Sequence, residues 1–120
     1  MLRAPFAHGA FVAALWFALG WAMEAPAQTA STEMLMFSVV IKDGRITPAR
    51  LEVPAGRKIK LAIKNEGPGP SEFENLNLRI EKVLAPGASS FVVIHPLQPG
   101  TYRFIDEFHA ATSELLLIAR

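Results

Sequence analysis

The stretch TYRFIDEFHAATSELL, residues 101–116, carries side chains whose types and spacing could bind a metal ion. Tyr102, Phe104 and Asp106 alternate along a segment with the composition of a β-strand, so their side chains should share one face. The face that takes two aromatic rings into a core therefore takes Asp106 with them. His109 follows three residues later. A carboxylate and an imidazole at this spacing could coordinate one cation.

Two more acids lie in a second segment that could reach the same point. Glu72 and Glu74 belong to EGPGPSEFEN, residues 66–75, whose two glycines and two prolines predict a loop. If this loop and the end of residues 101–106 meet at one rim of the fold, two to four carboxylates come close to one imidazole. Such acids repel each other and raise one another's pKa, and a bound cation removes that penalty.

The donor types suggest which metals such a site would accept. Oxygen-rich ligation with one imidazole suits Fe(II), Fe(III) or Mn(II), whereas Cu(I) prefers sulfur and Cu(II) accepts both donors. Removing one ligand should weaken binding and leave the fold intact. The predicted metal ligands are Glu72, Glu74, Asp106 and His109, and Glu107 and Glu114 are left open.

Each predicted ligand also has an interpretation without metal. Asp106 could pair with Arg79 or Arg103, or it could accept hydrogen bonds from loop N–H groups. His109 could be held by the backbone. The glutamates could be ordinary solvated acids, which are common on protein surfaces.

The first 27 residues have the layout of a secretory signal peptide. Residues 4–23 are apolar and free of formal charge, and Ala25 and Ala27 form an A-x-A cleavage site. We expect export to the periplasm, cleavage after Ala27 and a mature chain from Gln28, with residues 28–35 as a flexible lead-in. An uncleaved anchor helix is the alternative, because the apolar run approaches spanning length.

The remainder of the chain consists of short apolar or alternating segments separated by Pro/Gly turns. No long amphipathic helical period occurs, so the pattern predicts an all-β sandwich or barrel. A weaker segment, residues 76–83, is either a strand or an irregular crossing. The predicted strands are residues 34–42, 50–53, 57–65, 89–95, 101–106 and 114–119.

Composition excludes several classes of function. The formal net charge is +1, which gives no reason to invoke nucleic acid or a membrane surface. The chain has no cysteine, which removes thiolate catalysis, cysteine zinc sites and iron–sulfur clusters. No nucleophile elbow, phosphate-binding loop or dinucleotide motif is present, and whether the protein is an enzyme is left open.

The phrase ITPARLEVPAGRKIKLAIKNEG, followed by a loop, APG, LQPGTYRF and an acid-x-x-His loop, resembles the cupredoxin fold over residues 36–119. The resemblance implies a Greek-key β-sandwich over residues 36–120. Blue-copper members carry a histidine, a Cys-x-x-His pair and a methionine. In this chain their places are taken by Glu72, Asp106, His109 and, loosely, Glu114. Without a thiolate, a type 1 blue-copper site is excluded.

Three further phrases, PSEFENL, RIEKVLAPG and PGTYRFIDEFH, are similar to cupredoxin-like periplasmic subunits of bacterial ferrous-iron uptake systems, namely the Ftr-type subunit and the cupredoxin-like domain of EfeO. The resemblance implies that the protein binds iron and/or copper and assists oxidation of ferrous iron. It also implies an iron permease and a periplasmic iron-binding protein as partners. The alternative is a metal-free structural or interaction module that docks on a membrane transporter.

Overall fold

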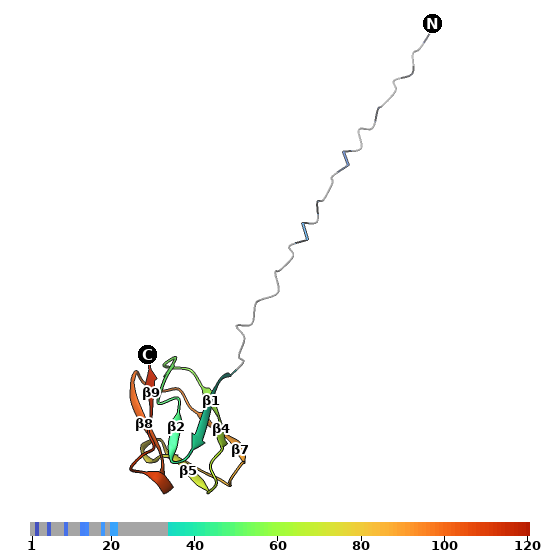
Figure 1. Ribbon diagram of the computed structural model, residues 1–120. Coiled ribbons are helices and arrows are strands. Elements are labelled where there is room, and N and C mark those ends of the chain that lie inside the picture. Colours follow the sequence, from blue (N-terminus) through green and yellow to red (C-terminus); the bar gives the residue numbers. More distant parts are fainter. Residues whose placement is uncertain are drawn as a thin grey trace. The chain divides into compact units, whose positions relative to one another are not determined.

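The fold is seen in a computed structural model that describes residues 34–120 continuously and eight scattered residues before them. The predicted signal peptide and most of the lead-in lie outside the continuous part. Residues Thr32–Arg120 form a compact unit of their own (Figure 1). Among the described residues, no helix has the length and apolarity needed to cross a bilayer.

The first of two sheets has four strands. Their order is β2 (Arg45–Thr47), β1 (Leu35–Lys42), β4 (Ile59–Asn65) and β7 (Ser89–Ile94). β1 and β4 run parallel, and the other neighbours are antiparallel. Because β1 begins at Leu35, the last residue of the expected lead-in belongs to a strand.

The second sheet has five strands and carries the predicted ligands. The order is β3 (Arg50–Val53), β9 (Leu115–Ala119), β8 (Gly100–Asp106), β5 (Ser71–Asn75) and β6 (Ile80–Leu84). Only β3 and β9 run parallel in it. Two single-turn 3₁₀ helices follow strands of this sheet: η1 (Leu76–Leu78) follows β5 and η2 (Glu107–His109) follows β8.

Apolar side chains from both sheets form one core, and every fully buried apolar residue lies between Val39 and Ala119. Phe73 of β5 and Phe104 of β8 stack at its centre, with ring centroids 4.9 Å apart. Among the described residues, the core is therefore formed by the segment from β1 to β9. The predicted all-β sandwich is confirmed.

The prediction of a loop over residues 66–75 was wrong in its second half, which is strand β5. Ser71, Phe73 and Asn75 are buried, and Glu72 and Glu74 project from the opposite face, so SEFEN has the period of a strand. The Gly/Pro cluster before it dominated the sequence pattern. Placing the two glutamates on a strand, and not on a rim loop, changes which residues they can meet.

Candidate metal site

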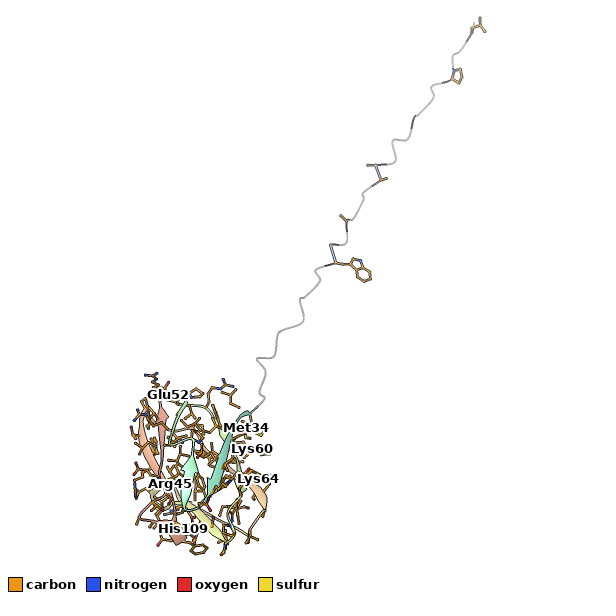
Figure 2. All side chains as sticks on the ribbon, viewed as in Figure 1. Met34, Arg45, Glu52, Lys60, Lys64 and His109 are labelled. Carbon is orange, nitrogen blue, oxygen red and sulfur yellow. The ribbon has the colours of Figure 1, made fainter. Side chains whose placement is uncertain are left out.

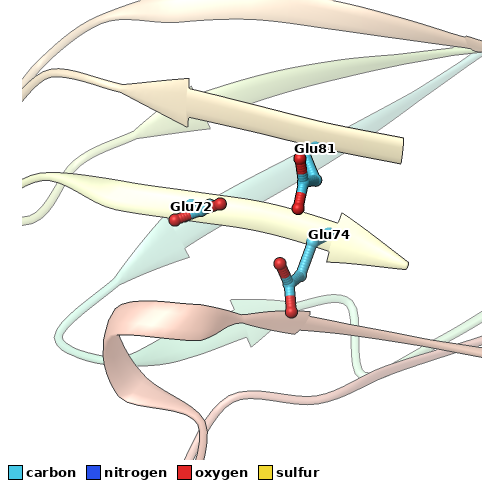
Figure 3. A group of neighbouring side chains, drawn as sticks. All are labelled: Glu72, Glu74 and Glu81. Atoms are coloured by element: carbon cyan, nitrogen blue, oxygen red, sulfur yellow. The ribbon is translucent and has the colours of Figure 1, made fainter. Parts of the chain in front are cut away.

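Three glutamates meet on the outer face of β5 and β6 (Figure 3). Glu72 and Glu74 are two residues apart on β5 and therefore project from the same side. Glu81 of β6 pairs directly with Glu74 across the two strands. One carboxylate oxygen from each lies within 4.8 Å of the others. Since metal–oxygen bonds are about 2.0–2.6 Å long, one cation between these oxygens could contact all three.

Glu74 is the most perturbed acid of the group. Only 5% of it is exposed, although it lies on the face away from the core. Its burial, a side-chain hydrogen bond with Glu107 and the negative charges of Glu107, Glu72 and Glu81 raise its pKa to about 7. Two carboxyl groups can share a hydrogen bond only if one is protonated. A cation that binds this carboxylate would therefore displace the proton of Glu74 into solvent.

Glu107 of η2, which the sequence left open as a ligand, lies beside Glu74, although it is not one of the three acids whose oxygens lie within 4.8 Å of one another. Glu114, also left open, is not part of this group. Its carboxylate forms an ion pair with Arg103, whose Nε lies 2.7 Å from Glu114 Oε2. The ion pairs formed by the described residues involve no member of the group. They are Arg103–Glu114, His109–Asp106 and Arg120–Glu52. We call Glu72, Glu74, Glu81 and Glu107 the acidic face.

Asp106 does project into the interior, as the alternation predicts, and none of its surface is exposed. It pairs with Phe73 across β8 and β5, so it lies on the core side of the sheet, opposite Glu72 and Glu74. Its Oδ1 accepts hydrogen bonds from the backbone N–H groups of Glu72 (2.8 Å) and Phe108 (3.1 Å). The carboxylate thus caps η2 and joins β8 to β5.

His109 contacts the second carboxylate oxygen of Asp106, with Nδ1 2.8 Å from Oδ2. This contact leaves Nε2 as the ring nitrogen for any ligand. The half-exposed ring lines a surface cavity of about 240 Å³ together with Asp43, Asn65 and Ser71.

The backbone around His109 is closely packed and held by hydrogen bonds. Gly44 has φ +68°, and a Cβ there would lie 2.9 Å from Thr112 Oγ1 and 3.1 Å from His109 Cδ2. Ser113 Oγ accepts from the Asp106 N–H at 2.8 Å and lies 2.8 Å from the carbonyl oxygen of His109. The role of Ser113 was not predicted from the sequence, because a serine before the last strand forms no distinct sequence pattern.

The structure therefore divides the four predicted ligands into two groups. Glu72 and Glu74 lie together with Glu81, which the sequence interpretation missed. Asp106 and His109 lie together on the other side of the sheet. The alternation of RIEKV against SEFEN could have identified Glu81, once both segments were taken as paired strands.

The two groups have different donor chemistry. A type 1 copper site does not fit this chain, because none of its residues is a cysteine. Asp106, which takes the place of the copper-binding cysteine, already accepts hydrogen bonds from two backbone N–H groups. The acidic face offers only carboxylate oxygens, which suit hard cations.

A family model described as "Cupredoxin-like domain" matches residues 9–118. Among curated proteins, the uncharacterized protein RP394 of Rickettsia prowazekii (strain Madrid E) is 35% identical over 85 residues, covering 71% of this chain and 68% of that protein.

Solved structures share the fold at low sequence identity. Reduced auracyanin of Roseiflexus castenholzii has 16% identity and a TM-score of 0.61, covering 73% of this chain and 98% of its own. The metal-binding domain of the Cu(I)-exporting P-type ATPase CopA of Streptococcus pneumoniae D39, solved with Cu(I), has 11% identity and a TM-score of 0.61, covering 74% and 97%. These likenesses concern the fold alone.

Proposed function

This chain belongs to the cupredoxin-like domain family, and we propose that it is an exported member that binds iron through carboxylates. The observation that carries the proposal is the acidic face. One carboxylate oxygen each from Glu72, Glu74 and Glu81 lies within 4.8 Å of the other two, and Glu74 is almost fully buried. Burying a charged group is costly unless it is paired or coordinates a metal. No basic side chain pairs with these acids among the described residues.

Iron fits this donor set better than copper does. Hard anionic oxygens bind Fe(II), Fe(III) and Mn(II) well, and the group contains neither the sulfur that Cu(I) prefers nor an imidazole. Carboxylates stabilise Fe(III) more than Fe(II), so an iron ion held here would be easier to oxidise. Copper(II) competes through its higher intrinsic affinity for most donor sets.

The biological role that we propose is a subunit of a periplasmic ferrous-iron uptake system, with iron as the cargo. Its partners would be an iron permease and a periplasmic iron-binding protein. Support comes from the phrases PSEFENL and PGTYRFIDEFH, which contribute three of the four acids of the acidic face. The alternative is a metal-free module that docks on a membrane transporter.

Of the original ligand set, the pair Asp106 and His109 stays a second candidate site, on the other side of the sheet from Glu72 and Glu74. One observation favours a role for His109: its Nε2 is not used by the contact with Asp106, and its ring lines a cavity. In this arrangement Asp106 would orient the imidazole and not bind the metal itself, as carboxylates behind metal-binding histidines commonly do.

The experiment is an anaerobic calorimetric titration of Fe(II), and separately of Cu(II), into the protein purified from the periplasm. The variants are Glu74→Gln, Glu81→Gln and His109→Gln. Glu114→Gln is the matched control, because it removes the same charge from an exposed acid that is paired with Arg103. Melting curves of each metal-free form check that the fold is intact.

If the acidic face is the site, one iron binds, and Glu74→Gln and Glu81→Gln each weaken it at least about tenfold. His109→Gln and Glu114→Gln then bind as the wild type does. Loss of binding in His109→Gln alone would assign the metal to the second site. Absence of binding below about 100 μM, a free energy weaker than about −5.5 kcal/mol, would favour the metal-free module.

A further inference from the structure

The outer face of the first sheet concentrates positive charge. Lys42 on β1 pairs with Arg45 on β2. On β4, Lys60 precedes Ala62 by two residues and Lys64 follows it by two. The alternation of each strand puts all four on the side away from the core, and Figure 2 labels three of them, Arg45, Lys60 and Lys64. We call Lys42, Arg45, Lys60 and Lys64 the basic face.

The acids nearest to these charges, Asp43 and Glu66, lie in the turns at the ends of the strands and form no ion pair among the described residues. Strands β1, β2, β4 and β7 contain no aspartate or glutamate. None of the four bases takes part in an ion pair among the described residues. The net charge of +1 conceals this segregation, because the acids gather on the other sheet. The total charge gave no reason to invoke a membrane, but the distribution of charge gives one.

Apolar side chains lie between the bases. Cross-strand pairing places Met36 and Val93 on either side of Lys60, and Phe91 beside Ala62. Met36 is 63% exposed and Phe91 50% exposed. The Lys60 Nζ atom lies 4.0 Å from the centroid of the Phe91 ring. The face therefore offers apolar side chains next to cations, the combination found on surfaces that lie on anionic bilayers.

The size of the face argues against a stable protein partner. Four strands spaced about 4.8 Å apart, with on average about six residues rising 3.3 Å each, cover a projected area of about 400 Å². A standard protein interface buries about 800 Å² on each side. A bilayer needs no matching patch of that size, because each base near an anionic surface contributes separately.

We propose that the basic face docks this domain on a bilayer surface rich in anionic phospholipid. The charge complementarity is between four unpaired bases and lipid phosphates, and Met36 and Phe91 enter the headgroup region. A second copy could instead offer its acidic face to the basic face, so self-association is an outcome that the test must detect. The proposal does not depend on metal binding, because none of its residues belongs to the acidic face.

The test uses the chain from Gln28 onward, which includes the compact unit Thr32–Arg120. It is sedimented with vesicles of phosphatidylcholine alone and with vesicles containing phosphatidylglycerol, at about 0.1 M salt, where screening acts over about 10 Å. The variants are Lys60→Gln/Lys64→Gln, Phe91→Ala, and the control Arg50→Gln/Lys82→Gln, which removes equal charge from the other sheet.

We expect binding to phosphatidylglycerol vesicles only, with about a fivefold loss of affinity for each lysine removed, hence about 25-fold for the double variant. Phe91→Ala should lose affinity several-fold, and the control should bind as the unsubstituted chain does. The proposal is overturned if the two vesicle types bind equally or not at all, or if the control loses as much as the lysine variant. Concentration-dependent self-association without vesicle binding, measured by analytical ultracentrifugation, would assign the face to a second copy.

Discussion

Glu74 carries an electrostatic cost in the metal-free protein. Its pKa is raised to about 7, first by burial and then by Glu107 and the other acids. Between its unfolded value of 4.5 and about 7, the folded protein holds a proton that the unfolded chain has released. Stability therefore falls as the pH rises through this window, and the full penalty is present above pH 7.

We expect Glu74→Gln to stabilise the metal-free protein at pH 8 and to have little effect at pH 4, where the carboxyl is protonated in both states. Urea unfolding at pH 4, 6 and 8 measures this. Glu114→Gln is the control and should show no such pH-dependent gain. A Glu74→Gln variant that is equally or less stable than wild type at pH 8 would contradict the electrostatic cost assigned to Glu74.

Asp106 illustrates the opposite case, an interior acid that the fold itself needs. The sequence interpretation expected removal of a ligand to leave the fold intact. The structure gives a different expectation, because the Asp106 carboxylate accepts two backbone N–H groups and contacts His109. Unmade hydrogen bonds to a buried charged group are costly.

We predict that Asp106→Ala lowers the free energy of unfolding by about 3 kcal/mol or more, since three interactions are lost at a site with no access to water. Asp106→Asn should recover part of this, because its side-chain oxygen can still accept the two N–H groups. Equilibrium urea unfolding of the metal-free proteins compares the three. If Asp106→Ala were as stable as wild type, the capping role would be wrong.

At the scale of elements, the segment after β8 is held by one serine. Ser113 Oγ bonds the Asp106 N–H and lies beside the His109 carbonyl, so it closes η2 against the start of β9. Ser113→Ala leaves a buried N–H without a partner and should cost about 1–3 kcal/mol. The exposed Ser89 on β7 supplies the control Ser89→Ala, which should change stability little. Equal stabilities for the two variants would remove Ser113 from this role.

Much of the second sheet could be predicted from its alternating apolar residues, and part of the site could not. The segments that became β8 and β9 have clear patterns, and the inward direction of Asp106 follows from Tyr102 and Phe104. Strand β5 was missed because its single core phenylalanine is flanked by acids and preceded by Gly/Pro. The partnership of Glu74 with Glu81 depends on pairing between strands, which no local pattern specifies.

At the scale of the whole molecule, charge is divided between two outer surfaces, the acidic face on one sheet and the basic face on the other. Neither surface follows from the net charge of +1. The division suits a domain that would rest on a membrane through one sheet and present cargo on the other. The proposed role in periplasmic iron uptake requires that the chain be exported.

We expect export to release a chain that starts at Gln28, because Ala25 and Ala27 form the cleavage site. Intact-mass measurement of the periplasmic fraction tests this, with Ala27→Phe as a variant that should block cleavage. A full-length product retained in the membrane by the wild type would favour an anchor helix over a signal peptide.

The position of the bound metal distinguishes the acidic face from the site beside His109. Crystals of the protein loaded with iron would be measured on both sides of the iron absorption edge. If iron binds to the acidic face, one anomalous peak lies within bonding distance of Glu72, Glu74 and Glu81. A peak beside His109, or no peak in protein loaded with iron, would contradict that assignment.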